Sequence, residues 1–185
     1  ATISILPFLY EMVGRQRRVA KRQGITMNAN VLRSESTGSV HIRSADPGEP
    51  PAIRFNFLST EHDRAGILAV IRKGRELMAT SPLREVTGEE IAPGAQLQSD
   101  EELLEWVRNN AETTYHPVGT CKMGSDPLAV VDRELRVHGI DGLRVADASI
   151  MPTLTSGNTN APAIMIGEKC AEMMLATAAA RKAAA

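Results

Sequence analysis

The sequence predicts an α+β fold in which an antiparallel sheet flanked by helices occupies residues 28–110. Three observations support this prediction. Apolar and polar residues alternate between 28 and 57, which is typical of strands with one solvated face. From 59 to 78, and again from 99 to 107, apolar residues recur at helical spacing. After Asn110 the chain becomes rich in Gly, Ser, Thr, Asp and Asn, which indicates a loop-rich segment before a C-terminal helix.

Residues 1–27 are expected to form an amphipathic connector helix, apolar in its first half and basic in its second. Two strands are expected next. Val40 and Ile42 alternate with polar residues, and Ile53, Phe55 and Phe57 do the same after the turn-rich segment 46–51.

Two helices complete the predicted α+β region. Residues 59–63 offer capping side chains for a helix that runs to about Met78. Ser99 and Glu102 have the spacing of a capping box, which predicts a helix beginning at Ser99.

The loop-rich segment is expected to contain two brief strands, at 130–131 and 143–146, because short apolar runs stand there between turns. Pro162 suits the first turn of a helix, so the C-terminal helix is expected from 163 to about 178.

Composition excludes several classes of function. The 185 residues carry 21 Lys and Arg against 22 Asp and Glu, and this net charge of -1 argues against a nucleic-acid-binding protein. Aromatic residues make up only 3%, too few for stacked platforms that bind bases or sugars. Two cysteines make neither a disulfide framework nor a zinc pattern, so we expect no metal site and reduced thiols.

His116 is the first candidate for catalysis. Pro117 pushes His116 toward an extended conformation, and Gly119 permits a tight turn or a close approach. An imidazole changes protonation near neutral pH, so a rigidly presented histidine suits proton transfer. The alternative is a histidine bonded to nearby backbone, and this segment by itself leaves both interpretations open.

The second candidate is the segment 156–162, directly before the C-terminal helix. The first amides of a helix lack intrahelical partners and carry partial positive charge, so they stabilise an anionic or electron-rich group. Asn158 and Asn160 add side-chain donors. Plain capping by Thr159 or Asn160 is the alternative.

The third candidate is the short apolar run 142–149, which ends in a carboxylate and small residues. Asp147 is either an acceptor for a ligand hydroxyl or the cap of a turn. Ala148 and Ser149 are small enough to let the backbone of a cofactor come close.

Taken together and in this order, these segments resemble the C-terminal signature of the glucose–methanol–choline (GMC) flavin oxidoreductases, in particular the branch with choline dehydrogenase and alcohol dehydrogenases. The resemblance is dense from 114 to 174 and looser from 36 to 78. The segments that carry it are 116–124 (HPVGTCKMG), 131–137 (VDRELRV), 142–149 (GLRVADAS), 158–162 (NTNAP) and 165–169 (MIGEK).

The resemblance implies oxidation of a small-molecule alcohol with FAD as cofactor. It implies that His116 acts as base toward the substrate hydroxyl while a hydride passes from the alcohol carbon to flavin N5. Asn158 would hydrogen-bond the substrate oxygen. Asp147 and Ala148 match the segment that contacts the FAD linker, and Asn158 with Thr159 matches the turn beneath the flavin.

The sequence departs from this family in one large respect: the glycine-rich G-x-G-x-x-G fingerprint of dinucleotide-binding domains does not occur in it. Residues 33–37 also differ from the version common in relatives. We therefore expect the C-terminal part of a longer enzyme whose N-terminal FAD-binding domain is absent. Its regions would be a connector helix at 1–27, a substrate-binding α+β domain at 28–110, and catalytic loops, short strands and a C-terminal helix at 111–185 that complete the FAD site.

The isolated chain is expected to be inactive and to bind FAD weakly at best. A non-catalytic structural or interaction domain is the alternative function. A C-terminal helix made to pack on the absent domain predicts exposed apolar surface and self-association. No apolar run approaches the ~20 residues of a membrane span. Reduced thiols are typical of a cytosolic protein, so a cytoplasmic protein is expected, either free or peripheral to the inner face of a membrane.

Overall fold

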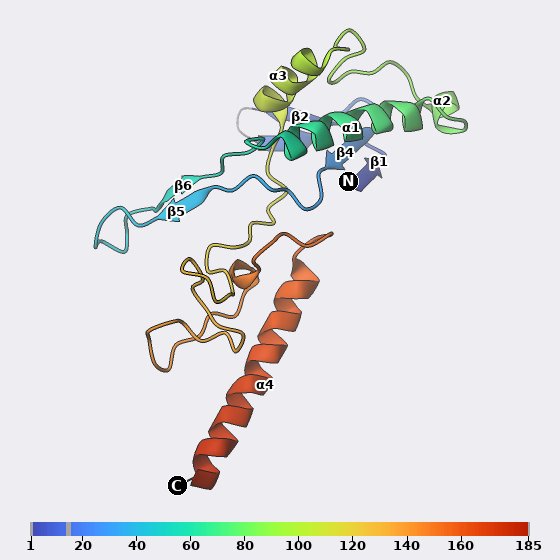
Figure 1. The fold of residues 1–185 in the computed structure, drawn as a ribbon. Coiled ribbons are helices and arrows are strands. Elements are labelled where there is room, and N and C mark those ends of the chain that lie inside the picture. The colour runs from blue at the N-terminus through green and yellow to red at the C-terminus, as the bar shows by residue number, and fades with distance from the viewer. Residues whose placement is uncertain (1, 14–15, 185) are drawn as a thin grey trace. The chain divides into compact units, whose positions relative to one another are not determined.

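The computed structural model describes residues 2–13 and 16–184, and the chain divides into two compact units (Figure 1). The first unit comprises Ala1–Ser36 and Leu58–Thr114. The second comprises Thr37–Phe57 and Tyr115–Ala185. The predicted division at 27/28 and 110/111 differs from this one, because residues 37–57 leave the first unit and fold with the C-terminal part.

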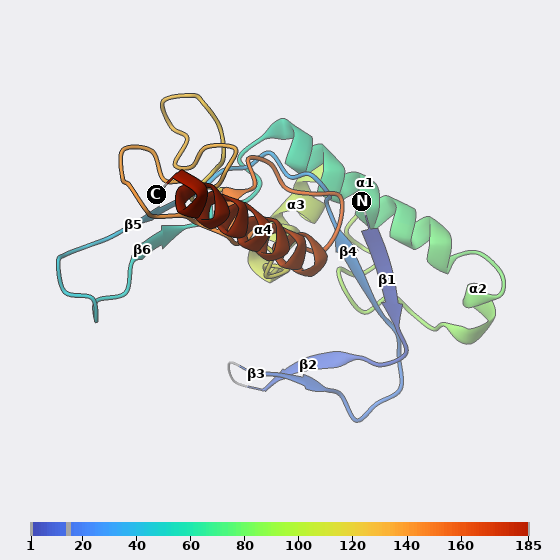
Figure 2. The ribbon, with the colours of Figure 1, turned by 90° about the horizontal axis from the view of Figure 1, so that it is seen from below.

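Two small antiparallel sheets begin the first unit. Strand β1 (Thr2–Leu6) pairs with β4 (Thr26–Asn30), with Ser4 opposite Asn28. Strands β2 (Tyr10–Val13) and β3 (Gln16–Val19) form a hairpin between them (Figure 2).

The expected connector helix at 1–27 is therefore wrong, because β1–β4 occupy this segment. The physical reason is visible in the residues. Residues 2–5 alternate polar and apolar with period two, which suits a strand. Pro7 lacks the N–H that a helix interior needs, and β4 supplies the hydrogen-bond partners of β1.

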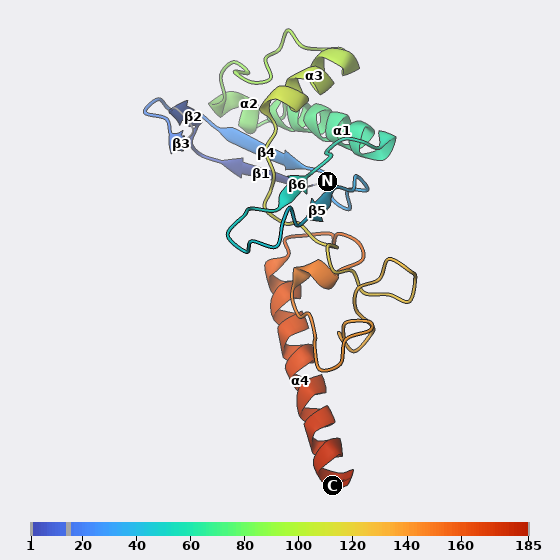
Figure 3. The ribbon, with the colours of Figure 1, turned by 90° about the vertical axis from the view of Figure 1, so that its left-hand side faces the viewer.

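Helix α1 (Glu61–Met78) lies against β4 and β1 (Figure 3). Gly74 on α1 is buried, and a Cβ at this position would overlap the side chain of Met27 on β4. The absence of a side chain thus lets the helix approach the sheet closely.

Both predicted helix starts in the first unit are confirmed. The Thr60 side chain caps α1 by accepting a hydrogen bond from the Asp63 backbone N–H. Helix α3 (Asp100–Asn110) begins with the complete Ser99–Glu102 capping box. A short helix α2 (Leu83–Val86) lies between them in the chain. The core of this unit comes from α1 and α3, which contact each other and bury Leu68, Val70, Leu103 and Val107.

The predicted strand pair between 28 and 57 is confirmed as a hairpin of the second unit. Strands β5 (Ser39–His41) and β6 (Ala52–Arg54) are antiparallel, with Val40 opposite Ile53. Gly38 precedes β5, and a Cβ there would overlap the carbonyl oxygen of Arg54, so the strands approach closely at this glycine. The α+β class holds, but three two-stranded sheets replace the single predicted sheet.

The remainder of the second unit is loop-rich, as predicted, and ends in helix α4 (Asn160–Ala184). The two brief strands expected at 130–131 and 143–146 are not formed. Isolated bridges take their place, joining Val131 to Met123 and Val137, and Arg136 to Arg144. Loop carbonyls and amides pair over such short stretches that no ladder develops. The buried core consists of Val131, Leu135, Ile150, Met151, Ile166 and Cys170.

Among the described helices, none combines the length and the apolar character that a bilayer crossing requires.

Candidate functional site

The loop that carries His116 is held against the segment 149–151. The backbone N–H of Cys121 donates to the Ser149 carbonyl over 3.0 Å, and that of Met123 donates to the Ile150 carbonyl over 2.8 Å. Gly119 has a φ of +87°, which is the left-handed region that favours glycine. These contacts place the His116 loop beside the segment that contains Ala148.

His116 also reaches the start of α4. Its Nδ1 lies 3.0 Å from the hydroxyl Oγ1 of Thr159, 43 residues further along the chain. His116 is half-buried and Thr159 is only 8% exposed. The interpretation of His116 as a histidine bonded only to nearby backbone is therefore not what the structure shows.

Asn158 is exposed and directly precedes Thr159. Since neighbouring Cα atoms lie about 3.8 Å apart, the contact between His116 and Thr159 brings Asn158 into the same neighbourhood. The two proposed catalytic residues, distant in sequence, thus belong to one region around the N-terminus of α4.

Asp147 serves as the cap of a turn. It precedes a short 3-10 helix at Ala148–Ile150, and its Oδ1 accepts a hydrogen bond from the Ser149 backbone N–H at 2.7 Å. Of the two interpretations that the sequence left open, capping is the one that this contact shows. The side chain is nevertheless exposed, so the carboxylate is accessible at the surface.

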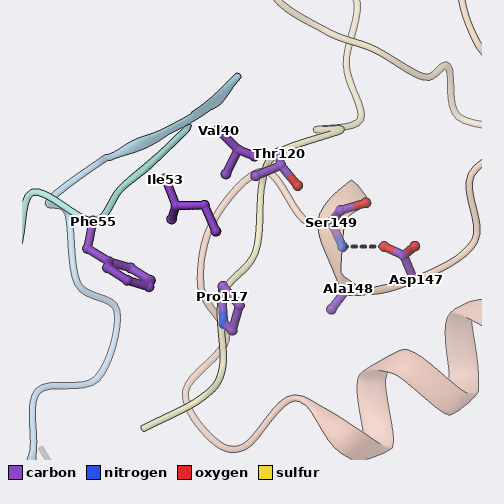
Figure 4. Close-up of a pocket in the computed structure, with 8 residues that line it drawn as sticks. All are labelled: Val40, Ile53, Phe55, Pro117, Thr120, Asp147, Ala148 and Ser149. Carbon is purple, nitrogen blue, oxygen red and sulfur yellow. Dashed lines mark hydrogen bonds between the residues drawn. The ribbon is translucent and has the colours of Figure 1, made fainter. Parts of the chain in front are cut away.

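A cavity of about 480 Å³ lies next to these residues (Figure 4). Its walls come from three parts of the second unit: the β5–β6 hairpin, the loop after His116, and the turn at Asp147. The hairpin contributes apolar side chains, and the turn contributes a carboxylate and small residues. The lining residues are Val40, Ile53, Phe55, Pro117, Thr120, Asp147, Ala148 and Ser149.

These residues suit the flavin ring of FAD but not its ADP part. The cavity is within the range of small-molecule sites, and the small side chain of Ala148 leaves room for a flat group. The N-terminus of α4, a helix of 25 residues, favours an electron-rich group such as the pyrimidine edge of a flavin. The ADP part of FAD has no phosphate-binding glycine loop in this sequence.

Sequence reasoning missed the walls that the hairpin supplies. The alternation of Val40, Ile53 and Phe55 with polar residues predicts strands, and nothing in this local pattern shows that the hairpin packs beside Asp147. The contact between Thr159 and His116 was also missed. No local pattern predicts this contact, because the two residues stand 43 positions apart in the chain.

In the part of the chain that the structure describes, no three His, Cys, Asp or Glu side chains are grouped so that they could hold a metal ion.

A known protein family matches most of the chain, including the candidate site. The model of the family described as GMC oxidoreductase matches residues 34–167. An oxygen-dependent choline dehydrogenase from Escherichia coli O127:H6 is 53% identical over 154 residues, which are 83% of this chain and 28% of that protein. The chain thus spans about a quarter of the length of the curated relatives it matches.

Solved structures give the same result. Pyridoxine 4-oxidase from Mesorbium loti aligns with a TM-score of 0.72 and 36% identity, over 76% of this chain and 27% of the other. An FAD-dependent oxidoreductase from Chaetomium thermophilum aligns with a TM-score of 0.72 and 33% identity, over 77% and 25%. The sequence resemblance to this family is confirmed.

Proposed function

Because the chain belongs to the GMC oxidoreductase family, we propose that it forms the C-terminal, substrate-binding and catalytic part of an FAD-dependent oxidoreductase that acts on alcohols of the choline type. The observation that carries this proposal is the contact between His116 and Thr159, which joins the candidate base to the start of α4 beside Asn158. An N-terminal part that binds the ADP portion of FAD is its expected partner.

His116 is the proposed base. Since Nδ1 is engaged by Thr159, Nε2 is the ring nitrogen that remains for the substrate. Nε2 takes the proton of the alcohol hydroxyl as the alcohol becomes a carbonyl compound. The Asn158 side-chain amide donates a hydrogen bond to the same oxygen and stabilises the negative charge that develops there.

Asp147, Ala148, Asn158 and Thr159 are the residues that would contact the cofactor. When bound, FAD supplies the acceptor for the hydride that leaves the alcohol carbon. The exposed carboxylate of Asp147 can accept from a cofactor hydroxyl while its Oδ1 still caps the turn. Amides at the start of α4 add positive potential toward an electron-rich ring edge.

The proposal is tested on the complete enzyme that contains this chain. We expect purified protein to carry FAD and to lose its flavin absorbance when choline is added without oxygen. Glycine betaine, which has no hydroxyl, serves as the matched control and should leave the spectrum unchanged. An FAD-loaded enzyme whose spectrum responds to neither choline nor other primary alcohols would contradict the proposal.

A non-catalytic interaction domain remains the second candidate for the isolated chain, and its exposed apolar residues favour it. Ile164 and Met165 on α4 are 59% and 54% exposed. On β6, Ile53 is 56% exposed, and directly after β6 Phe55 stacks on Phe57 with the ring centroids 5.1 Å apart. Apolar side chains left in water favour association.

The isolated chain is therefore expected to self-associate. Sedimentation velocity should show species larger than a monomer, and Ile164→Glu should shift the distribution toward monomer because a charge on an apolar contact costs free energy. Replacing the exposed, already charged Glu168 by Gln is the control and should leave the distribution unchanged. A monodisperse monomer for the unaltered chain would contradict the expectation.

A further inference from the structure

The hydroxyl of Thr159 lies 3.0 Å from Nδ1 of His116 and is largely shielded from water. We propose that Thr159 is a positioning residue that keeps the proton of neutral His116 on Nδ1 and thereby leaves Nε2 as a base toward the substrate. This inference rests on the proposed function, in which His116 accepts the hydroxyl proton.

The position of Thr159 explains why its hydroxyl is available. Thr159 directly precedes α4, and its carbonyl accepts the first helical hydrogen bond, from the Ala163 N–H at 2.9 Å. A threonine in this place commonly bonds through its hydroxyl to the N–H of the third helical residue. That residue is Pro162, which has no N–H. The hydroxyl therefore has no capping donor at that residue, and it pairs with the imidazole.

The backbone around His116 is held in place by other contacts. The side-chain torsions that orient the imidazole ring are therefore the only part left for Thr159 to fix. Pro117 restricts the conformation of His116, and Cys121 and Met123 are hydrogen-bonded to the 149–150 backbone. A hydrogen bond at Nδ1 fixes the imidazole about its remaining torsions. In neutral histidine, the group bonded to one ring nitrogen also determines which nitrogen carries the proton.

Two arrangements of this hydrogen bond can be compared. If Nδ1–H donates to Oγ1 of Thr159, Nε2 has a lone pair and can accept the alcohol proton. If the hydroxyl donates to Nδ1, Nε2 carries the proton and cannot act as a base. When Nε2 takes up the alcohol proton, the imidazolium donates from both ring nitrogens. The hydrogen bond from Nδ1–H to Thr159 is therefore kept only in the first arrangement. Catalytic groups that need no reorganisation during the reaction stabilise the transition state best, so the first arrangement is the one we assign.

The test uses the complete FAD-loaded enzyme in three variants. Thr159→Val replaces the hydroxyl by a methyl group at nearly constant volume, and Thr159→Ser retains the hydroxyl. Thr155→Val is the matched control, since Thr155 is a half-buried threonine in the same loop that bonds to the Gly157 carbonyl. Two readouts are taken: kcat/KM for choline, and the ¹⁵N NMR shifts of His116, assigned by their absence from His116→Ala.

We expect the unaltered enzyme to show the Nδ1–H tautomer. Thr159→Val should produce a mixture of tautomers and, because the ring also loses the contact that orients it, lower kcat/KM by up to about 10²-fold. Thr159→Ser and Thr155→Val should remain close to the unaltered enzyme in both readouts. Flavin absorbance of each variant shows whether the cofactor is retained.

Three results would overturn the assignment: an Nε2–H tautomer in the unaltered enzyme, a Thr159→Val variant with unchanged tautomer and rate, or loss of flavin with an unchanged tautomer. The last result would make Thr159 a cofactor contact only. Failure of the proposed function is distinguishable, since His116→Ala would then oxidise choline at the normal rate whatever the tautomer.

Discussion

Replacing His116 by Ala in the complete enzyme is expected to lower kcat/KM for choline about 10²–10⁴-fold, the usual contribution of a general base. Without the imidazole, the alcohol proton has no acceptor at the start of α4, and the hydride leaves more slowly from a carbon whose oxygen keeps its proton. Steady-state kinetics measure the loss. The flavin spectrum should persist, because His116 is assigned to the substrate and not to the cofactor.

His138→Ala is the matched control for this substitution. His138 is an exposed histidine on a loop of the same unit, its Nε2 pairs with the Gly124 carbonyl at 3.1 Å, and it does not line the cavity. Its replacement should leave kcat/KM near the normal value. Normal turnover by His116→Ala would remove His116 from the mechanism and leave Asn158 without its assigned partner.

Asp63→Ala is expected to destabilise the first unit by about 3 kcal/mol, as expected when buried donors lose their acceptor. Asp63 is 2% exposed. Its carboxylate accepts hydrogen bonds from the Ser34 hydroxyl at 2.5 Å and from the backbone N–H groups of Glu35 and Ser36 at 3.0 and 2.8 Å. It therefore joins the start of α1 to the segment that follows β4.

The same carboxylate predicts a pH dependence. Burial by itself would raise the pKa of Asp63, but the hydrogen bonds from Ser34, Ser36 and Glu35 outweigh it and lower the pKa from 3.8 to about 2. A lowered folded-state pKa stabilises the fold above the unfolded-state value, and this contribution is lost as the pH falls from about 4 through 2. The lowering corresponds to about 2 kcal/mol.

Urea unfolding between pH 2 and pH 6 measures both effects of Asp63. The unaltered chain should lose stability toward the acid end, and Asp63→Asn should flatten that loss because its amide does not titrate. Asp141→Asn, at an exposed carboxylate, is the control and should retain the slope. An unchanged slope in Asp63→Asn would show that another group causes the acid sensitivity.

Helix starts were predictable from the residues alone. The Ser99–Glu102 capping box and the Thr60 cap depend on side chains that bond to backbone within three positions, so a short window of sequence contains all the partners. The turn at 46–51 was predictable for the same reason, and its Asp46 carboxylate accepts from the Gly48 N–H.

The N-terminal segment was predicted wrongly because its structure depends on a distant partner. Thr2–Leu6 becomes a strand by pairing with Thr26–Asn30, and α1 covers this pair. The alternation at residues 2–5 is too brief to outweigh the apolar-to-basic trend of the whole segment, which is the pattern that predicts a helix.

In the candidate site, too, some features follow from local sequence and others depend on distant parts of the chain. The residue types and their order along the chain were enough to identify the family and to single out His116, Asn158, Asp147 and Ala148. Tertiary structure alone decided that Thr159 would engage His116 and that the β5–β6 hairpin would wall the cavity beside Asp147. Chemical character and capping belong to a residue and its near neighbours, whereas burial and long-range hydrogen bonds depend on which surfaces the folded chain brings into contact.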